Sequence, residues 1–198
     1  SRMGGVLNYA VDDEPATLDA NMSGQRPDMI VFFSLYDSLV ALDPETQTFV
    51  PWLATSWEIS KDGRSYTFKL RKDVKFHDGT PFNAEAVKFN FDRQHDPNFK
   101  SRAMGAFGFY KSSEVVDEYT VKINLTQPVA PFLDYASFAY RMVSPTAVKK
   151  WGDADFGRHP VGTGPFKFVE WVANDHITIE KNPDYNWAPQ IALHQGPA

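Results

Sequence analysis

Residues 74–85 read VKFHDGTPFNAE, and this stretch decides how the middle of the chain folds. Its Asp-Gly pair is a strong turn signal, and a Thr-Pro pair leads from the turn to Asn83, a residue type that caps helices. After this cap, Ala84, Val87 and Phe91 recur at the spacing of one helix face. The stretch therefore predicts the end of a strand, a tight turn and a helix that begins at Ala84.

His77 and Asp78 stand side by side in this stretch, a pairing that would suit a proton relay or a metal site. Adjacent residues on an extended segment point to opposite faces, whereas a catalytic base and its orienting carboxylate converge in space. The chain also has no G-x-S-x-G motif to supply a nucleophile. We interpret the pair as part of a turn and expect His77 to be replaceable with little loss of ligand binding.

Three pairs of alternating segments predict β-hairpins around this helix. They join 53–59 to 64–70 through Asp62-Gly63, 114–116 to 119–125, and 166–172 to 176–180. Further expected elements are a strand at 6–11, a helix capped by Asp28, and short helices at 131–135 and 145–151. The segment GTGPFKF at 162–168 does not match the order of a phosphate loop, so its glycines are expected to supply unusual backbone angles before a strand.

Composition restricts the classes of function. The 198 residues are 42% hydrophobic and 15% aromatic, enough for one large domain or two small ones with a substantial core. A net charge of −5 without a strongly basic stretch argues against nucleic acid and anionic membranes as partners. No cysteine is present, which excludes disulfides and thiol chemistry. The histidines lack metal-ligand spacing, and no signal peptide or membrane-spanning apolar run is visible.

Aromatic residues in loops are the most distinctive candidates for ligand contact. Phe107 lies in the glycine-punctuated segment 105–110, and Phe138, Tyr140 and Arg141 follow a predicted short helix. Aromatic side chains beside an arginine suit a pocket for an organic, partly anionic ligand. The alternative is that the same aromatic residues fill the core.

Seven motifs follow one another along the chain. They are EPATLD at 14–19, YDSLV at 36–40, PWLATSWE at 51–58, DGRSYTFKLR at 62–71, VKFHDGTPFNAE at 74–85, PVGTGPFKF at 160–168 and EKNPDY at 180–185. In this order they resemble the family 5 extracellular solute-binding proteins, which include the dipeptide-, oligopeptide- and nickel-binding proteins of bacterial ABC importers. Each motif is weakly specific by itself, but the ordered set covers nearly the whole chain.

The resemblance implies an α/β fold, the N-terminal part of a two-lobed periplasmic-binding-protein-like architecture whose second lobe is absent from this sequence. Residues 1–41 would then begin the first lobe with a strand, a cleft loop and a helix. Residues 42–160 would form a β-rich subdomain with short helices, and 161–198 would return to the first lobe.

The implied function is the substrate-binding component of an ABC importer, which is not an enzyme and needs no cofactor. Such a protein closes around a small-molecule or peptide ligand and delivers it to a membrane permease. It would be periplasmic or extracellular, with a lipid anchor as an option. The positions that correspond to cleft-facing segments of relatives are Asn21, Met22, Ser23, Met104, Phe107, Phe138, Tyr140 and Arg141. Arg141 hints at an anionic group on the ligand.

Two expectations concern the 198-residue chain by itself. With one lobe it should bind the natural ligand weakly or not at all, and apolar surface left uncovered should promote self-association. A hydrolase or metal-dependent enzyme is the alternative class, which convergence of His77, His159 or His176 with carboxylates in one pocket would favour.

Overall fold

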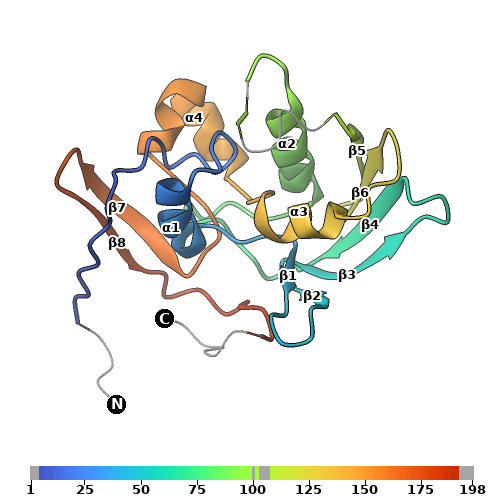
Figure 1. The fold of residues 1–198 in the computed structure, drawn as a ribbon, viewed down its shortest axis with the longest axis horizontal. Coiled ribbons are helices and arrows are strands. Elements are labelled where there is room, and N and C mark those ends of the chain that lie inside the picture. The colour runs from blue at the N-terminus through green and yellow to red at the C-terminus, as the bar shows by residue number, and fades with distance from the viewer. Residues whose placement is uncertain (1–4, 100, 103–107, 192–198) are drawn as a thin grey trace.

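The computed structural model describes residues 5–99, 101–102 and 108–191. No helix in these ranges is long and apolar enough to cross a membrane. In chain order the elements are α1 (Arg26–Leu35), β1 (Val40–Leu42), β2 (Phe49–Pro51), β3 (Ala54–Ile59), β4 (Ser65–Leu70), α2 (Ala84–His95), β5 (Tyr110–Asp117), β6 (Thr120–Leu125), α3 (Phe132–Phe138), α4 (Pro145–Asp155), a 3-10 turn η1 (Phe156–Arg158), β7 (Phe166–Val172) and β8 (His176–Lys181). Figure 1 shows the β7–β8 hairpin and the β3–β6 strands at opposite ends of the molecule.

The main sheet has four antiparallel strands in the order β3-β4-β6-β5. All three predicted hairpins are confirmed: β3 pairs with β4, β5 with β6, and β7 with β8. On β4, Tyr66 and Phe68 are buried, while Thr67 and Lys69 lie on the more exposed face. This alternation leaves one sheet face apolar, and α2 packs beside β5 and β6.

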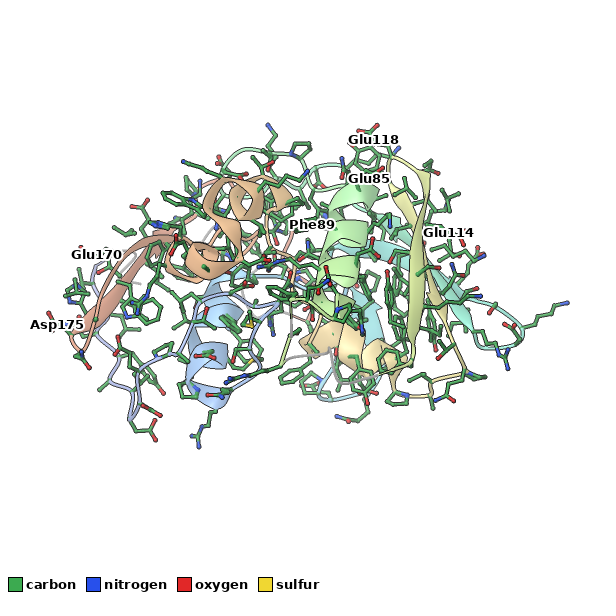
Figure 2. All side chains as sticks on the ribbon, turned by 90° about the horizontal axis from the view of Figure 1, so that it is seen from above. Glu85, Phe89, Glu114, Glu118, Glu170 and Asp175 are labelled. Carbon is green, nitrogen blue, oxygen red and sulfur yellow. The ribbon has the colours of Figure 1, made fainter. Side chains whose placement is uncertain are left out.

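Two clusters of buried side chains form the core. The larger lies between the sheet, α2 and α3, and the smaller is built from α1, α4 and residues near Leu18. Phe89 on α2 packs against the smaller cluster, and Figure 2 shows it between the two ends of the molecule. The division at 41/42 and 160/161 remains a prediction.

The stretch 74–85 folds as its sequence predicts. Gly79 adopts a left-handed φ of 82° in a turn closed by the Phe76 amide, which donates to the Thr80 carbonyl over 2.9 Å. Asn83 caps α2, because its side-chain oxygen accepts a hydrogen bond from the Ala86 amide at 3.0 Å. The helix begins at Ala84, as predicted, and runs to His95.

His77 has a structural role that its sequence context did not reveal. Its Nε2 lies 2.9 Å from the Gly164 carbonyl, and its Nδ1 accepts from the Gly162 amide at 3.3 Å. These two bonds require a neutral ring with the proton on Nε2. His77 therefore ties the stretch 74–85 to the glycine-rich segment that precedes β7.

The glycines of that segment do not supply unusual backbone angles, so this expectation was wrong. Neither Gly162 nor Gly164 has a positive φ. Instead, a Cβ on Gly162 would lie 2.1 Å from the Leu35 carbonyl oxygen, and one on Gly164 would lie 2.5 Å from the Leu35 carbonyl carbon. Glycine is needed here because the segment passes directly against the end of α1.

We expect His77 to lower the free energy of unfolding as the pH drops from about 6.5 towards about 4. Burial lowers the pKa of His77 from 6.5 to about 4, so the unfolded chain takes up the proton first. This difference is worth up to about 3 kcal/mol. Burial raises the pKa of Asp37 to about 6, and this carboxyl group opposes the trend because it favours folding at low pH.

Urea unfolding at about pH 7 and about pH 4.5 tests this expectation, with His77→Gln for comparison. The glutamine amide can still donate to the Gly164 carbonyl but does not titrate. Between about pH 7 and about pH 4.5, the wild type should lose more stability, or gain less, than the variant. The same pH dependence in both proteins would show that His77 is not the titrating group.

The segment after β8 folds back towards α1 and buries Asn182, Tyr185 and Trp187. Asn182 donates from Nδ2 to the Gly164 carbonyl at 3.1 Å. Farther on, the Tyr185 hydroxyl and the Trp187 indole both donate to the buried carboxylate of Asp37, at 3.3 and 2.9 Å. This part of the chain thus closes the apolar region between the sheet and α1.

Two predicted features near the N-terminus are absent. Residues 5–11 form no strand and have no partner strand among the described residues, and Val6 and Leu7 are each 90% exposed. α1 begins at Arg26, not after Asp28, because Pro27 occupies its first turn. The Asp28 side chain instead accepts a hydrogen bond from the Ala16 amide at 2.8 Å.

Candidate functional site

A hollow of about 310 Å³ lies between the loop that precedes α1, α1 itself and the end of α3. Its walls combine apolar side chains with two arginines and small loop residues. The lining residues are Ala20, Ser23, Gly24, Gln25, Met29, Phe32, Arg102, Phe138, Ala139 and Arg141. A mostly apolar concave site with a few polar groups is the usual form of a small-molecule site.

The loop of residues 19–25, which we term the cleft loop, forms one wall. It starts with a tight turn in which the Met22 and Ser23 amides donate to the Asp19 carbonyl at 3.0 and 3.3 Å. Asn21 is fully buried, and its Nδ2 donates to the Arg141 carbonyl at 3.1 Å. Of the three predicted residues in this loop, only Ser23 lines the hollow. Asn21 and Met22 instead make the hydrogen bonds that fix the conformation of the loop.

Arg141 is the most informative residue of the site. Its side chain is 2% exposed, and Nη1 donates to the Tyr36 carbonyl at 3.1 Å. Its Nε has no hydrogen-bond partner in the described part of the chain, and the guanidinium carbon lies 4.3 Å from the centre of the Phe33 ring. Burial lowers the pKa of Arg141 to about 10, with the Asp37 carboxylate opposing the change, so the group stays charged at neutral pH.

Of the remaining predicted residues, one lines the hollow and one lies in the core. Phe138, at the end of α3, is 53% exposed and lines the hollow. Tyr140 does not: its ring stacks on Phe91 at 4.0 Å and its hydroxyl lies 2.6 Å from Nε2 of His95, inside the core. The placement of Tyr140 as a ligand contact is therefore corrected to core filling. Met104 and Phe107 lie outside the described residues.

The structure brings Ser23 together with Phe138 and Arg141, which lie more than 100 positions later in the chain. The sequence did not single out Arg102, Met29 or Phe32, which also line the hollow. Met29 and Phe32 belong to the apolar stripe of α1, a pattern that indicates a buried helix face and not a ligand site. Arg102 precedes the segment 104–107 that the resemblance indicated, and this proximity was the only available signal.

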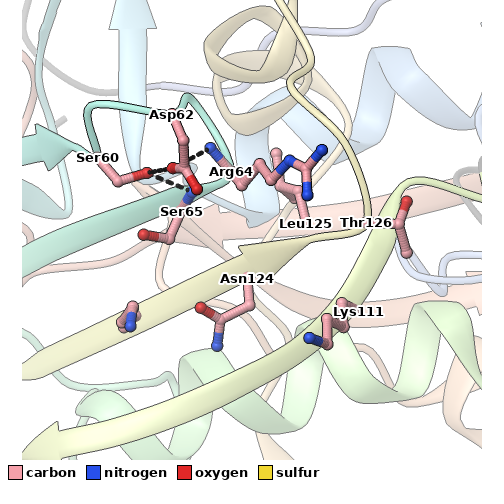
Figure 3. Close-up of a pocket in the computed structure, with 9 residues that line it drawn as sticks. Ser60, Asp62, Arg64, Ser65, Lys111, Asn124, Leu125 and Thr126 are labelled. Atoms are coloured by element: carbon pink, nitrogen blue, oxygen red, sulfur yellow. Dashed lines mark hydrogen bonds between the residues drawn. The ribbon is translucent and has the colours of Figure 1, made fainter.

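A second hollow, of about 600 Å³, lies at the β3–β4 turn on the outer side of the sheet. Figure 3 shows polar side chains around it, and Leu125 is its only apolar lining residue. The Asp62 carboxylate is held inside the turn, where it accepts from the Ser60 hydroxyl at 2.6 Å and the Arg64 amide at 3.1 Å. None of the predicted ligand-contacting residues that the structure describes lies here, so the first hollow is the better candidate.

The histidines do not gather in one pocket in the described parts of the chain. His77 is held by the glycine-rich segment, and His159 stacks on Trp151 at 3.6 Å. His176 lies within 3.3 Å of both Glu170 and Asp175, but this group sits on an exposed hairpin end, where Figure 2 shows the two carboxylates. Among the described residues, no group of three His, Asp or Glu side chains could hold a metal ion.

Comparison with known proteins places this geometry in a family. The family described as "Bacterial extracellular solute-binding proteins, family 5 Middle" matches residues 48–196. The chain belongs to the family 5 extracellular solute-binding proteins. The resemblance of the seven motifs is thus confirmed.

Relatives of this family share both sequence and fold with the chain. It is 39% identical over 177 residues to the glutathione-binding protein GsiB of Pectobacterium atrosepticum, across 89% of this chain and 34% of the relative. NikA from Brucella suis, solved with Fe(III)-EDTA, has a TM-score of 0.81 and 38% identity over 92% of this chain and 36% of its own. DppA from Helicobacter pylori, solved with the peptide STSA, has a TM-score of 0.77 and 33% identity. This match covers 89% of this chain and 38% of DppA.

These likenesses confirm the expected fold class, an α/β portion of the periplasmic-binding-protein fold. The chain spans about a third of the length of the relatives it matches. The activity and ligands of the complete relatives therefore come to this chain only as a proposal.

Proposed function

We propose that this chain forms part of the substrate-binding component of an ABC importer, which captures peptide-like or similar small solutes for a membrane permease. The observation that carries the proposal is Arg141, a buried cation in the wall of an apolar hollow whose Nε has no hydrogen-bond partner among the described residues. A solute-binding family and a hollow with this lining both favour capture of a ligand over catalysis. The proposed location is the periplasm or the cell exterior, with or without a lipid anchor.

We further propose that the ligand carries a carboxylate. Arg141 and Arg102 supply two cations to the hollow, while Met29, Phe32 and Phe138 supply apolar surface. A carboxylate is the natural partner for an arginine, because its two oxygens match the guanidinium donors. Glutathione, peptides and EDTA all carry carboxylates, so the ligands named for the relatives fit this lining. Glutathione is the first ligand to test.

Calorimetry of the full-length protein with glutathione tests the assignment through Arg102→Met. We expect the affinity to fall about tenfold or more, since a hydrogen bond to a charged group is worth about 1.5–3 kcal/mol. Arg102 is exposed, so its replacement should leave the fold intact. Arg64→Met is the matched control, because Arg64 is an exposed cation beside the outer hollow. Equal weakening by both variants would point to general charge effects and contradict the assignment.

The chain as given should bind glutathione much more weakly than the full-length protein. Binding in this class uses contacts from both lobes to shift the equilibrium between open and closed forms. The hollow described above supplies one wall of such a site. Micromolar affinity of the 198-residue chain for glutathione in the same calorimeter would contradict this expectation.

A further inference from the structure

Arg93, near the end of α2, makes a buried fork-to-fork pair with Asp19. Nη1 donates to Oδ1 at 3.0 Å and Nη2 to Oδ2 at 2.7 Å, and the two side chains are 6% and 2% exposed. Nη1 also lies 3.3 Å from the Asn21 side-chain oxygen. Such a bidentate pair fixes the relative position of its partners in both distance and orientation.

The other side of the guanidinium is held by α4 and by aromatic rings. Nε and Nη2 both donate to Oδ1 of Asp153, at 3.0 and 2.8 Å. The Phe99 ring centre lies 3.9 Å from the guanidinium carbon. The guanidinium is therefore held by carboxylates on two sides and by the Phe99 ring.

The partners of Arg93 begin the cleft loop. Asp19 accepts the Asn21 amide on Oδ1 at 3.0 Å, and its carbonyl accepts the Met22 and Ser23 amides. The loop is tied next to the segment after α2, where the Arg102 amide donates to the Met22 carbonyl at 2.8 Å. Hence Asp19 sets the course of the chain to Ser23, and Ser23 and Arg102 both line the hollow.

We propose that Arg93 is a positioning residue for the ligand site. It does not line the hollow, yet it holds the cleft loop against α2 and so fixes the wall that contains Ser23 and the neighbouring Arg102. The sheet and α2 would thereby set the geometry of a ligand site that they do not themselves touch. The part of this inference that concerns affinity rests on the proposed function, whereas the part that concerns the loop does not.

Arg93→Lys tests the inference, because lysine keeps the charge but cannot reproduce a fork that spans two carboxylates. Arg71→Lys is the matched control, because Arg71 also makes a bidentate pair, through Nε and Nη2 with Asp73 at 3.0 and 2.7 Å, but at a partly exposed site. In the full-length protein, hydrogen exchange of the Met22, Ser23 and Arg102 amides should rise about tenfold or more in the Arg93 variant and stay unchanged in the control. Exchange in β3 and β4 should be unchanged in both.

Two outcomes of the exchange experiment would overturn the inference. One is unchanged exchange of the loop amides in Arg93→Lys. The other is an equal rise in the loop and in β4, which would mean general destabilisation and no positioning role.

Calorimetry with glutathione supplies the second readout. Arg93→Lys should weaken binding about tenfold, while Arg71→Lys should stay within about threefold of the wild type. Unchanged affinity in Arg93→Lys would overturn the positioning role. If the wild type itself does not bind glutathione, the assignment of that ligand fails, and hydrogen exchange alone decides the role of Arg93.

Discussion

Replacing Gly164 with alanine is expected to lower the free energy of unfolding by about 3 kcal/mol or more, a large fraction of the ~5–15 kcal/mol typical of native proteins. A Cβ at this position would lie 2.5 Å from both the Leu35 carbonyl carbon and the Ser34 carbonyl oxygen. Both are backbone atoms at the end of α1, so no side chain can rotate away to make room. The segment would have to move, and that movement would strain the hydrogen bonds from His77 and Asn182 to the Gly164 carbonyl.

Urea unfolding followed by circular dichroism measures this effect, and Gly108→Ala is the control. A Cβ on Gly108 meets nothing within 4 Å among the described residues, and its φ is not positive. The control should stay within about 0.5 kcal/mol of the wild type. A Gly164→Ala protein as stable as the control would show that the segment and α1 are not packed as closely as described.

The elements predicted correctly from the sequence are those whose causes are local. The β3–β4 hairpin is specified by alternation on both sides of Asp62-Gly63, and α2 by its Asn83 cap and apolar stripe. In each case the residues that specify the element are close to one another in the sequence. Such signals need no knowledge of the rest of the chain.

The features that the sequence could not reveal depend on distant partners. His77 meets Gly164 across 87 positions, and Arg93 meets Asp19 across 74. The glycines at 162 and 164 were expected to serve local backbone angles, but the reason for them is α1, which precedes them by more than 100 residues. A single sequence carries no record of which separated segments come together.

The ligand site shows the same limit at close range. Phe138 and Tyr140 are both aromatic and only two positions apart, yet one lines the hollow and the other fills the core. α3 ends between them, so the chain turns and the two side chains point to different regions. Composition and spacing could nominate both residues but could not separate them.

Replacing Trp187 with alanine is expected to cost about 3–5 kcal/mol. The side chain is 3% exposed, and its indole nitrogen donates to Oδ2 of Asp37 at 2.9 Å and to the Thr163 carbonyl at 3.1 Å. Alanine would leave a cavity and remove a donor from a buried carboxylate. Trp187→Phe separates the two effects, since it keeps a large ring but loses the N–H group, and we expect it to cost about 1–3 kcal/mol.

The pH dependence of the cost of Trp187→Phe can show whether the lost hydrogen bond to the Asp37 carboxylate causes that cost. Burial raises the pKa of Asp37 to about 6 although Trp187 holds the ionised form, so the folded protein binds more protons than the unfolded chain between about pH 4 and pH 6. This group therefore lowers stability as the pH rises through that window. Loss of the indole donor should raise the pKa of Asp37 further, because the ionised carboxylate would lose a stabilising hydrogen bond.

Trp187→Phe should consequently cost more at about pH 8, where Asp37 is ionised, than at about pH 5, where it is mostly protonated. Urea unfolding at the two pH values measures the difference. The same comparison in an Asp37→Asn background is the control, because the amide does not titrate and the cost should then be equal at both. An equal cost in the original background would mean that the indole stabilises the fold only through its ring and its bond to Thr163.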